Sequence, residues 1–104
     1  MSPVNAPAAE RLSLRGELNI YRAAELKAQL LAALDGAPAL ELDLSGVTEI
    51  DSAGVQLLML ARRSALARQR ALRLVGHSAA VNDVFQLLDL HAYFGDPLPT
   101  PAGA

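Results

Sequence analysis

The sequence contains no cysteine among its 104 residues. Disulfide bonds, thiolate metal sites and a cysteine nucleophile are therefore excluded, and the composition fits a reducing compartment. Aromatic residues are also scarce, at 4% of the chain, although 52% of the residues are hydrophobic. We therefore expect one compact domain whose core is built from leucine, valine and alanine rather than from large rings.

Long hydrophobic runs and a strong net charge are missing as well. The longest strongly apolar stretch, Val55 to Ala61, is far shorter than the roughly 20 residues of a membrane span, and the polar start does not resemble a signal peptide. The formal net charge of −2 gives no reason to expect direct nucleic-acid binding. The arginines between residues 62 and 73 are interpreted as a solvated helix face, with a DNA-binding helix as the less favoured alternative. We expect a cytoplasmic protein without direct membrane insertion.

The two ends of the chain differ in composition from its middle. Residues 1–9 and 96–104 are rich in small residues and proline, and we interpret them as flexible tails around a domain at residues 10–95. Inside the domain, strand-like and helix-like patterns alternate three times. This order predicts an α/β fold in which parallel strands are joined by right-handed crossovers.

Alternating hydrophobic residues predict the strands. The first is expected at residues 11–18, with a bend or bulge at Gly16. The second is expected at residues 39–45, where leucines alternate with polar residues, and the third at residues 71–75. Residues 46–51 are interpreted as a short link between the second strand and the following helix.

Three helices are expected between and after the strands. The first is predicted to run from a cap at Asn19 to about residue 35, and the second from a cap at Ser52 to about residue 69. Ser78 is placed to cap the third helix. The apolar residues of that helix follow the i, i+3, i+4, i+7 spacing of one helix face: Val81, Val84, Phe85 and Leu88.

The second helix is apolar on two sides. Its expected core face consists of Leu57, Leu58, Ala61 and Ala65. The face that carries Ser52 also includes Val55, Met59 and Leu66, which predicts an apolar strip beside the serine. A helix of this kind is either deeply buried or available to a partner, and we favour the partner interpretation.

Ser52 lies where a strand leads into a helix, at the edge of a parallel sheet where ligands and partners commonly bind. Its hydroxyl can accept a hydrogen bond from a backbone N–H of the first helical turn, which would be a purely structural role. The same position also suits a phosphate, because the free N–H groups and the helix dipole stabilise negative charge there. Phosphorylation would add a charge of about −1.5 to −2 and alter the surface seen by a partner.

At this point the sequence resembles the STAS domain, a family named for sulfate transporters and anti-sigma factor antagonists. The resemblance covers roughly residues 10 to 95, and the last of its motifs is the most specific. The motifs are Gly16-Glu17-Leu18, Ala24-Glu25-Leu26, Leu42-Asp43-Leu44-Ser45 and Ile50-Asp51-Ser52-Ala53-Gly54-Val55. The resemblance implies a STAS-like α/β fold, with a mixed, partly parallel sheet of about four strands and helices packed against it.

The resemblance also implies a function. In bacterial anti-sigma factor antagonists, the serine that matches Ser52 is phosphorylated by a serine kinase that is also the anti-sigma factor. The unphosphorylated domain would bind this partner, phosphorylation would release it, and a serine phosphatase would reset the cycle. The resemblance thus implies a phosphorylation site at Ser52 and a surrounding partner-binding surface. That surface comprises Asp51, Ser52, Ala53, Gly54, Val55, Gln56, Met59 and Arg63.

Two alternatives stay open. Some stand-alone members of the family are non-switching subunits of lipid-transport ABC systems or belong to chemotaxis and surface-signalling complexes, and Ala53 replaces the second serine of many antagonists. An enzyme is the other, less favoured alternative, because the serine block lacks the first glycine of a nucleophile elbow and no nucleotide-binding motif occurs. His77 and His91 have no carboxylate at metal-site spacing and are assigned surface or turn roles. We therefore expect no catalytic residues, no metal and no cofactor.

Overall fold

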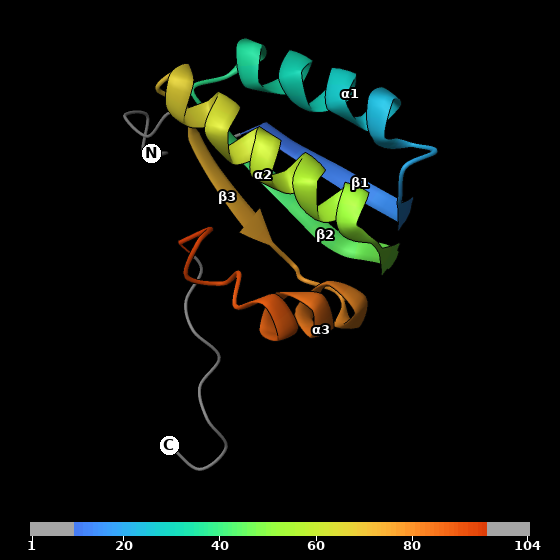
Figure 1. Ribbon diagram of the computed structural model, residues 1–104. Helices are drawn as coiled ribbons and strands as arrows, with labels where there is room; N and C mark the ends of the chain where they lie inside the picture. Colours follow the sequence, from blue (N-terminus) through green and yellow to red (C-terminus); the bar gives the residue numbers. More distant parts are fainter. Residues whose placement is uncertain (1–9, 96–104) are drawn as a thin grey trace, which may run out of the picture.

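The computed structural model describes residues 10–95, and the tails expected at 1–9 and 96–104 lie outside the described residues. Strands and helices alternate as the sequence predicts (Figure 1). In chain order they are β1 (Glu10–Leu18), α1 (Ala23–Gly36), β2 (Ala39–Ile50), α2 (Ser52–Ala67), β3 (Ala71–Val75) and α3 (Ala79–Leu88). Within this part of the chain, no helix has the length and apolarity that spanning a membrane would require.

The three strands form one sheet in the order β1-β2-β3. Both pairs of neighbours are parallel, so α1 and α2 are the crossovers that return the chain to the starting end of the sheet. Figure 1 shows α1 and α2 side by side on one face of the sheet, with α3 beyond the end of β3 and on the other side. The α/β fold is confirmed. The sheet expected from the resemblance was mixed and had about four strands, whereas residues 10–95 form a parallel sheet of three strands. The strands are parallel because a helical crossover separates each pair of consecutive strands.

β1 is irregular, as the sequence predicts. Its register against β2 shifts between Ser13 and Arg15 and again between Gly16 and Glu17. Gly16 has a φ of 76°, in the left-handed region that a residue without a Cβ adopts at little cost. The predicted bend or bulge at Gly16 is therefore confirmed.

β2 is longer than the alternation of its leucines predicts. Residues 46–50 are not a link, because β2 continues to Ile50, where it pairs with Leu18 at the end of β1, and only Asp51 separates β2 from α2. The alternation is interrupted at Gly46, and the next buried residue is Val47. The link prediction was wrong because the second half of β2 is held by the bulged half of β1, and that partnership is not visible in the local pattern.

The core lies between the sheet and the pair α1 and α2, and it continues to α3 through Val81 and Phe85. It consists mainly of leucines that are almost completely buried, including Leu14, Leu18, Leu26, Leu30, Leu34, Leu40, Leu42, Leu44 and Leu58. Phe85 of α3 is the one aromatic residue among the largest fully buried side chains of residues 10–95. The expectation of a core without many large rings is met in this part of the chain.

The helix starts differ in how well the sequence predicts them. Ser78 caps α3 by accepting a hydrogen bond from the Val81 N–H, as expected. Asn19 does not cap α1, which begins only at Ala23. Its side-chain oxygen instead accepts hydrogen bonds from the N–H groups of Tyr21 and Arg22. Asn19 therefore stabilises the turn between β1 and α1, a role that asparagine also performs well.

Candidate functional site: the N-terminus of α2

The first turn of α2 is fixed by the residue before Ser52. Asp51 has an extended backbone, and its carboxylate accepts a hydrogen bond from the Gly54 N–H at 3.0 Å. The Asp51 N–H in turn donates to the carbonyl oxygen of Leu18 at 3.2 Å, which ties the helix start to the end of β1. The prediction that Ser52 is the cap was wrong, because Ser52 is already the first residue in helical conformation. Its side chain is exposed and is not required for capping.

Gly54 allows α2 to approach β1 closely. A Cβ atom at this position would lie 2.5 Å from the Leu18 carbonyl oxygen and 2.8 Å from side-chain atoms of Leu18 and Ile50. Real side chains do not tolerate such distances, so a glycine is needed for packing alone. In the Asp-Ser-Ala-Gly block, Asp51 therefore caps the helix, Ser52 presents an exposed hydroxyl, and Gly54 allows close packing against β1.

The structure separates the predicted partner-binding residues into three groups. Asp51, Ser52, Gln56 and Arg63 are exposed, Ala53 and Met59 are half-buried, and Gly54 and Val55 are buried.

The expected core face of α2, consisting of Leu57, Leu58, Ala61 and Ala65, is confirmed as buried. The apolar strip beside the serine is not an exposed strip. Val55 is 7% exposed and belongs to the core, and Met59 packs against the core from its edge. Leu66, at 60% exposure, is the strip's one exposed large residue. The strip prediction was wrong because neighbouring elements enclose the start of α2 on more than one face. Val55, which lies away from the core face of the helix, is therefore also buried.

An apolar hollow lies instead on the α1 side of Ser52. It has a volume of about 400 Å³ and is bounded by the start of α1 and the first turns of α2. Its lining is Ile20, Ala23, Ala24, Lys27, Ala53, Gln56, Leu57, Leu60 and Arg63. The lining includes two cations and no carboxylate.

A second hollow, of about 510 Å³, lies on the α3 side of the same helix start. Its lining includes the carboxylates of Glu49, Asp51 and Asp83. Asp51 lines this hollow and Ala53 lines the apolar one, so Ser52 stands between an acidic hollow and an apolar hollow.

Sequence reasoning missed the contribution of the turn between β1 and α1. Ile20 is 69% exposed and Tyr21 is 92% exposed, and Ile20 lines the apolar hollow. A signal was present, because two large apolar residues follow one another between a strand and a helix in a chain with few aromatics. The interpretation of residues 19–35 as one continuous helix concealed it.

Asp43, in the Leu42-Asp43-Leu44-Ser45 block, has a structural role near the same end of the sheet. Its carboxylate accepts a hydrogen bond from the Ser45 N–H at 3.0 Å. This bond, with a smaller contribution from the Ser45 side chain, lowers the pKa of Asp43 below its ordinary value of 3.8. Asp43 also lies against Gly76, where a Cβ atom would come within 2.6 Å of its Oδ1.

The two histidines lie together, away from Ser52. His77 follows β3 and is half-buried, whereas His91 follows α3 and is 7% exposed. Their ring centroids are 5.7 Å apart, and each ring also lies 5.3 Å from the Phe85 ring. His91 lies in a turn, as expected, but it is buried and not at the surface, because the segment after α3 packs against the domain. Within residues 10–95 the histidines and carboxylates do not gather in any group of three or more that could hold a metal ion.

Comparison with known proteins places this geometry in a family. Residues 1–98 match the family model described as "Mlab, STAS domain". Proteins with curated descriptions include none that matches the chain.

Among solved structures, an anti-sigma factor antagonist from Mycobacterium paratuberculosis is similar, with a TM-score of 0.75 and 24% identity. The match covers 97% of this chain and 92% of that one. The unphosphorylated form of the anti-sigma factor antagonist SpoIIAA is similar with a TM-score of 0.69 and 22% identity, over 94% of this chain and 85% of that one. At these identities the two structures show a shared fold.

Proposed function

The chain belongs to the STAS domain family, and from that premise we propose that it is a phosphorylatable protein-interaction switch resembling an anti-sigma factor antagonist. In this proposal the domain binds an anti-sigma factor that is also a serine kinase while Ser52 is unphosphorylated. Phosphorylation of Ser52 releases the partner, and a serine phosphatase restores the binding form. The domain is the substrate of this cycle and not its catalyst.

The observation that carries the proposal is the exposed hydroxyl of Ser52 beside the apolar hollow. Because Asp51 supplies the helix cap, the hydroxyl can be modified without loss of the hydrogen bond that starts α2. The fold therefore has no need of Ser52 as a cap, and a kinase can reach it from solvent.

Electrostatics support a release mechanism. A phosphate on Ser52 would receive some stabilisation from the N-terminal end of α2. It would also add about −1.5 to −2 charges next to Asp51 and beside an apolar surface. A partner that buries this surface would have to desolvate the phosphate or bring its own carboxylates close to it, and both are unfavourable. Phosphorylation is thus expected to weaken docking without altering the fold.

The buried positions of Gly54 and Val55 narrow the proposed partner surface. These two residues shape the start of α2 from inside, whereas Ser52, Ala53, Gln56 and Arg63 remain available on its outer side. The lining of the apolar hollow extends this surface toward α1, through Ile20, Ala24 and Lys27. We propose that the partner covers the serine and the apolar hollow together.

The switch is tested first by locating the phosphate. Mass spectrometry of the protein from growing cells, and after incubation with its kinase and ATP, is expected to place the phosphate on Ser52. The partner captured by the wild-type protein is then offered to Ser52→Ala and Ser52→Asp. We expect Ser52→Ala to retain binding and Ser52→Asp to lose it. Gln29→Glu, which adds a charge at an exposed position of α1, is the matched control and should bind normally. Ser52 unmodified under all conditions, with full binding by Ser52→Asp, would contradict the switch.

A second candidate function is a non-switching STAS subunit of a lipid-transport ABC system or of a chemotaxis or surface-signalling complex. The apolar hollow favours it, because most of its lining residues are apolar and permanent packing suits an apolar surface. Ile20→Glu separates contact from switching, since Ile20 is exposed and its replacement leaves the core intact. Loss of the complex with Ile20→Glu but not with Ser52→Asp would favour the subunit. Met59→Glu is less suitable because Met59 packs against the core.

A further inference from the structure

The outer edge of β3 carries backbone groups that face away from the sheet. β3 is the last strand in the order β1-β2-β3, so within residues 10–95 it is paired on one side only. The Ala71 N–H donates to the carbonyl oxygen of Pro38, at the start of β2, at 3.0 Å. Because successive residues of a strand direct their backbone groups to opposite sides, the N–H and C=O groups of Leu72 and Leu74 point outward.

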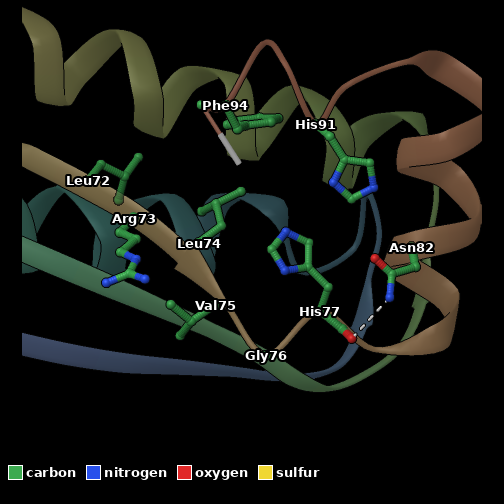
Figure 2. A pocket seen from close by; sticks show the side chains of 10 residues that line it. Leu72, Arg73, Leu74, Val75, Gly76, His77, Asn82, His91 and Phe94 are labelled. Atoms are coloured by element: carbon green, nitrogen blue, oxygen red, sulfur yellow. Dashed lines mark hydrogen bonds between the residues drawn. The ribbon is translucent and has the colours of Figure 1, made fainter. Parts of the chain in front are cut away.

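This edge forms one wall of a groove of about 700 Å³. The other wall comes from α3 and the segment after it, with Asn82, His91 and Phe94 (Figure 2). The Asn82 side chain donates to the His77 carbonyl oxygen at 3.4 Å and closes one end of the groove. The second wall would prevent the sheet of another molecule from pairing edge to edge with β3. A single extended chain, in contrast, can lie between the two walls.

Arginines gather around the groove although the chain as a whole is slightly acidic. Arg73 belongs to its lining, which contains no carboxylate, and its guanidinium also lies 3.9 Å from the carboxylate of Glu41 on the neighbouring strand. An adjoining hollow of about 220 Å³ shares part of this lining and adds Arg62 and Arg70, again without a carboxylate. The Nε of Arg70 is buried and has no hydrogen-bond partner within residues 10–95. The distribution of charge therefore favours a ligand with acidic groups.

We propose that this edge of β3 binds an acidic, extended segment of a partner protein, which joins the sheet as an additional strand. The outward backbone groups of Leu72 and Leu74 supply the hydrogen bonds of strand addition, and the surrounding cations select acidic side chains. A small anion would use the cations but leave the backbone groups of the edge unsatisfied, so a peptide fits better. The site is independent of Ser52 and of the function proposed above, because it lies on a different edge of the domain.

The probe is a fluorescein-labelled peptide, Thr-Glu-Val-Glu-Val-Glu-Thr, titrated with the full chain at low ionic strength and followed by fluorescence anisotropy. Saturable binding is expected. Leu72→Pro removes one outward N–H while leaving the pairing with β2 intact, and Leu72→Ala removes the side chain but keeps the N–H. We expect Leu72→Pro to bind about two- to tenfold more weakly than Leu72→Ala, since one hydrogen bond is lost. Circular dichroism checks that both variants are folded.

Charge and backbone contributions are separated by further variants and probes. Arg73→Gln should weaken binding, whereas Arg63→Gln, an exposed arginine of α2 outside the groove, should not. Ser52→Asp should also bind normally, so failure of the switch and failure of this proposal are distinguishable. The same peptide with N-methylated amides on one edge should lose affinity even if Leu72→Pro does not fold.

Three results would overturn the proposal. They are no saturable binding at millimolar peptide, equal binding of the N-methylated peptide, and tighter binding of a single-stranded oligonucleotide that is insensitive to Leu72→Pro.

Discussion

Replacing Gly54 with alanine adds one methyl group where α2 meets the end of β1. The new Cβ would lie 2.5 Å from the carbonyl oxygen of Leu18 and 2.8 Å from the Ile50 side chain. A backbone oxygen cannot rotate out of the way, so α2 must shift away from β1. Overpacking of this kind costs typically about 1–3 kcal/mol, and the contact with main-chain atoms favours the upper end of that range. The better helix propensity of alanine offsets at most about 1 kcal/mol.

The net destabilisation for Gly54→Ala is therefore about 2 kcal/mol. For a domain of this size such a loss lowers the melting temperature by roughly 8–16 °C. Thermal unfolding followed by circular dichroism measures it directly. Gly36→Ala is the matched control, because Gly36 is the last residue of α1 and a Cβ there would meet no atom within 4 Å. A Gly54→Ala protein that melts at the same temperature as Gly36→Ala would refute the packing argument.

Two further predictions follow from hydrogen bonds at helix and strand ends. Asp51→Ala is expected to cost about 1 kcal/mol of unfolding free energy, because it removes the cap of α2, whereas Ser52→Ala should be nearly neutral in urea unfolding. The reverse order would show that Ser52 is the cap. The hydrogen bond from Ser45 depresses the pKa of folded Asp43, so its stabilisation is complete above the unfolded pKa and disappears as the pH falls through the folded pKa. Urea unfolding between pH 7 and pH 3 should therefore show a smaller acid loss for Asp43→Asn than for wild type, and parallel curves would contradict the assignment.

The sequence alone was sufficient for features that depend on neighbours along the chain. Leucine alternation predicted the start of β2, the 3.6-residue period predicted the buried face of α2, and Ser78 was recognised as the cap of α3. The family motif located the exposed Ser52. These features were predictable because hydrophobic period and capping are local properties of the chain.

Features that depend on contacts between distant segments became visible only in the folded domain. The extension of β2 to Ile50 depends on pairing with the bulged half of β1. Val55 is buried because several elements of the fold pack around the start of α2. Asp51, not Ser52, caps α2. The backbone of Asp51 is fixed by the hydrogen bond from its N–H to the carbonyl oxygen of Leu18, more than thirty residues earlier in the chain. The pattern of a strand or helix indicates which face is apolar, but tertiary packing decides which apolar residues remain open to a partner.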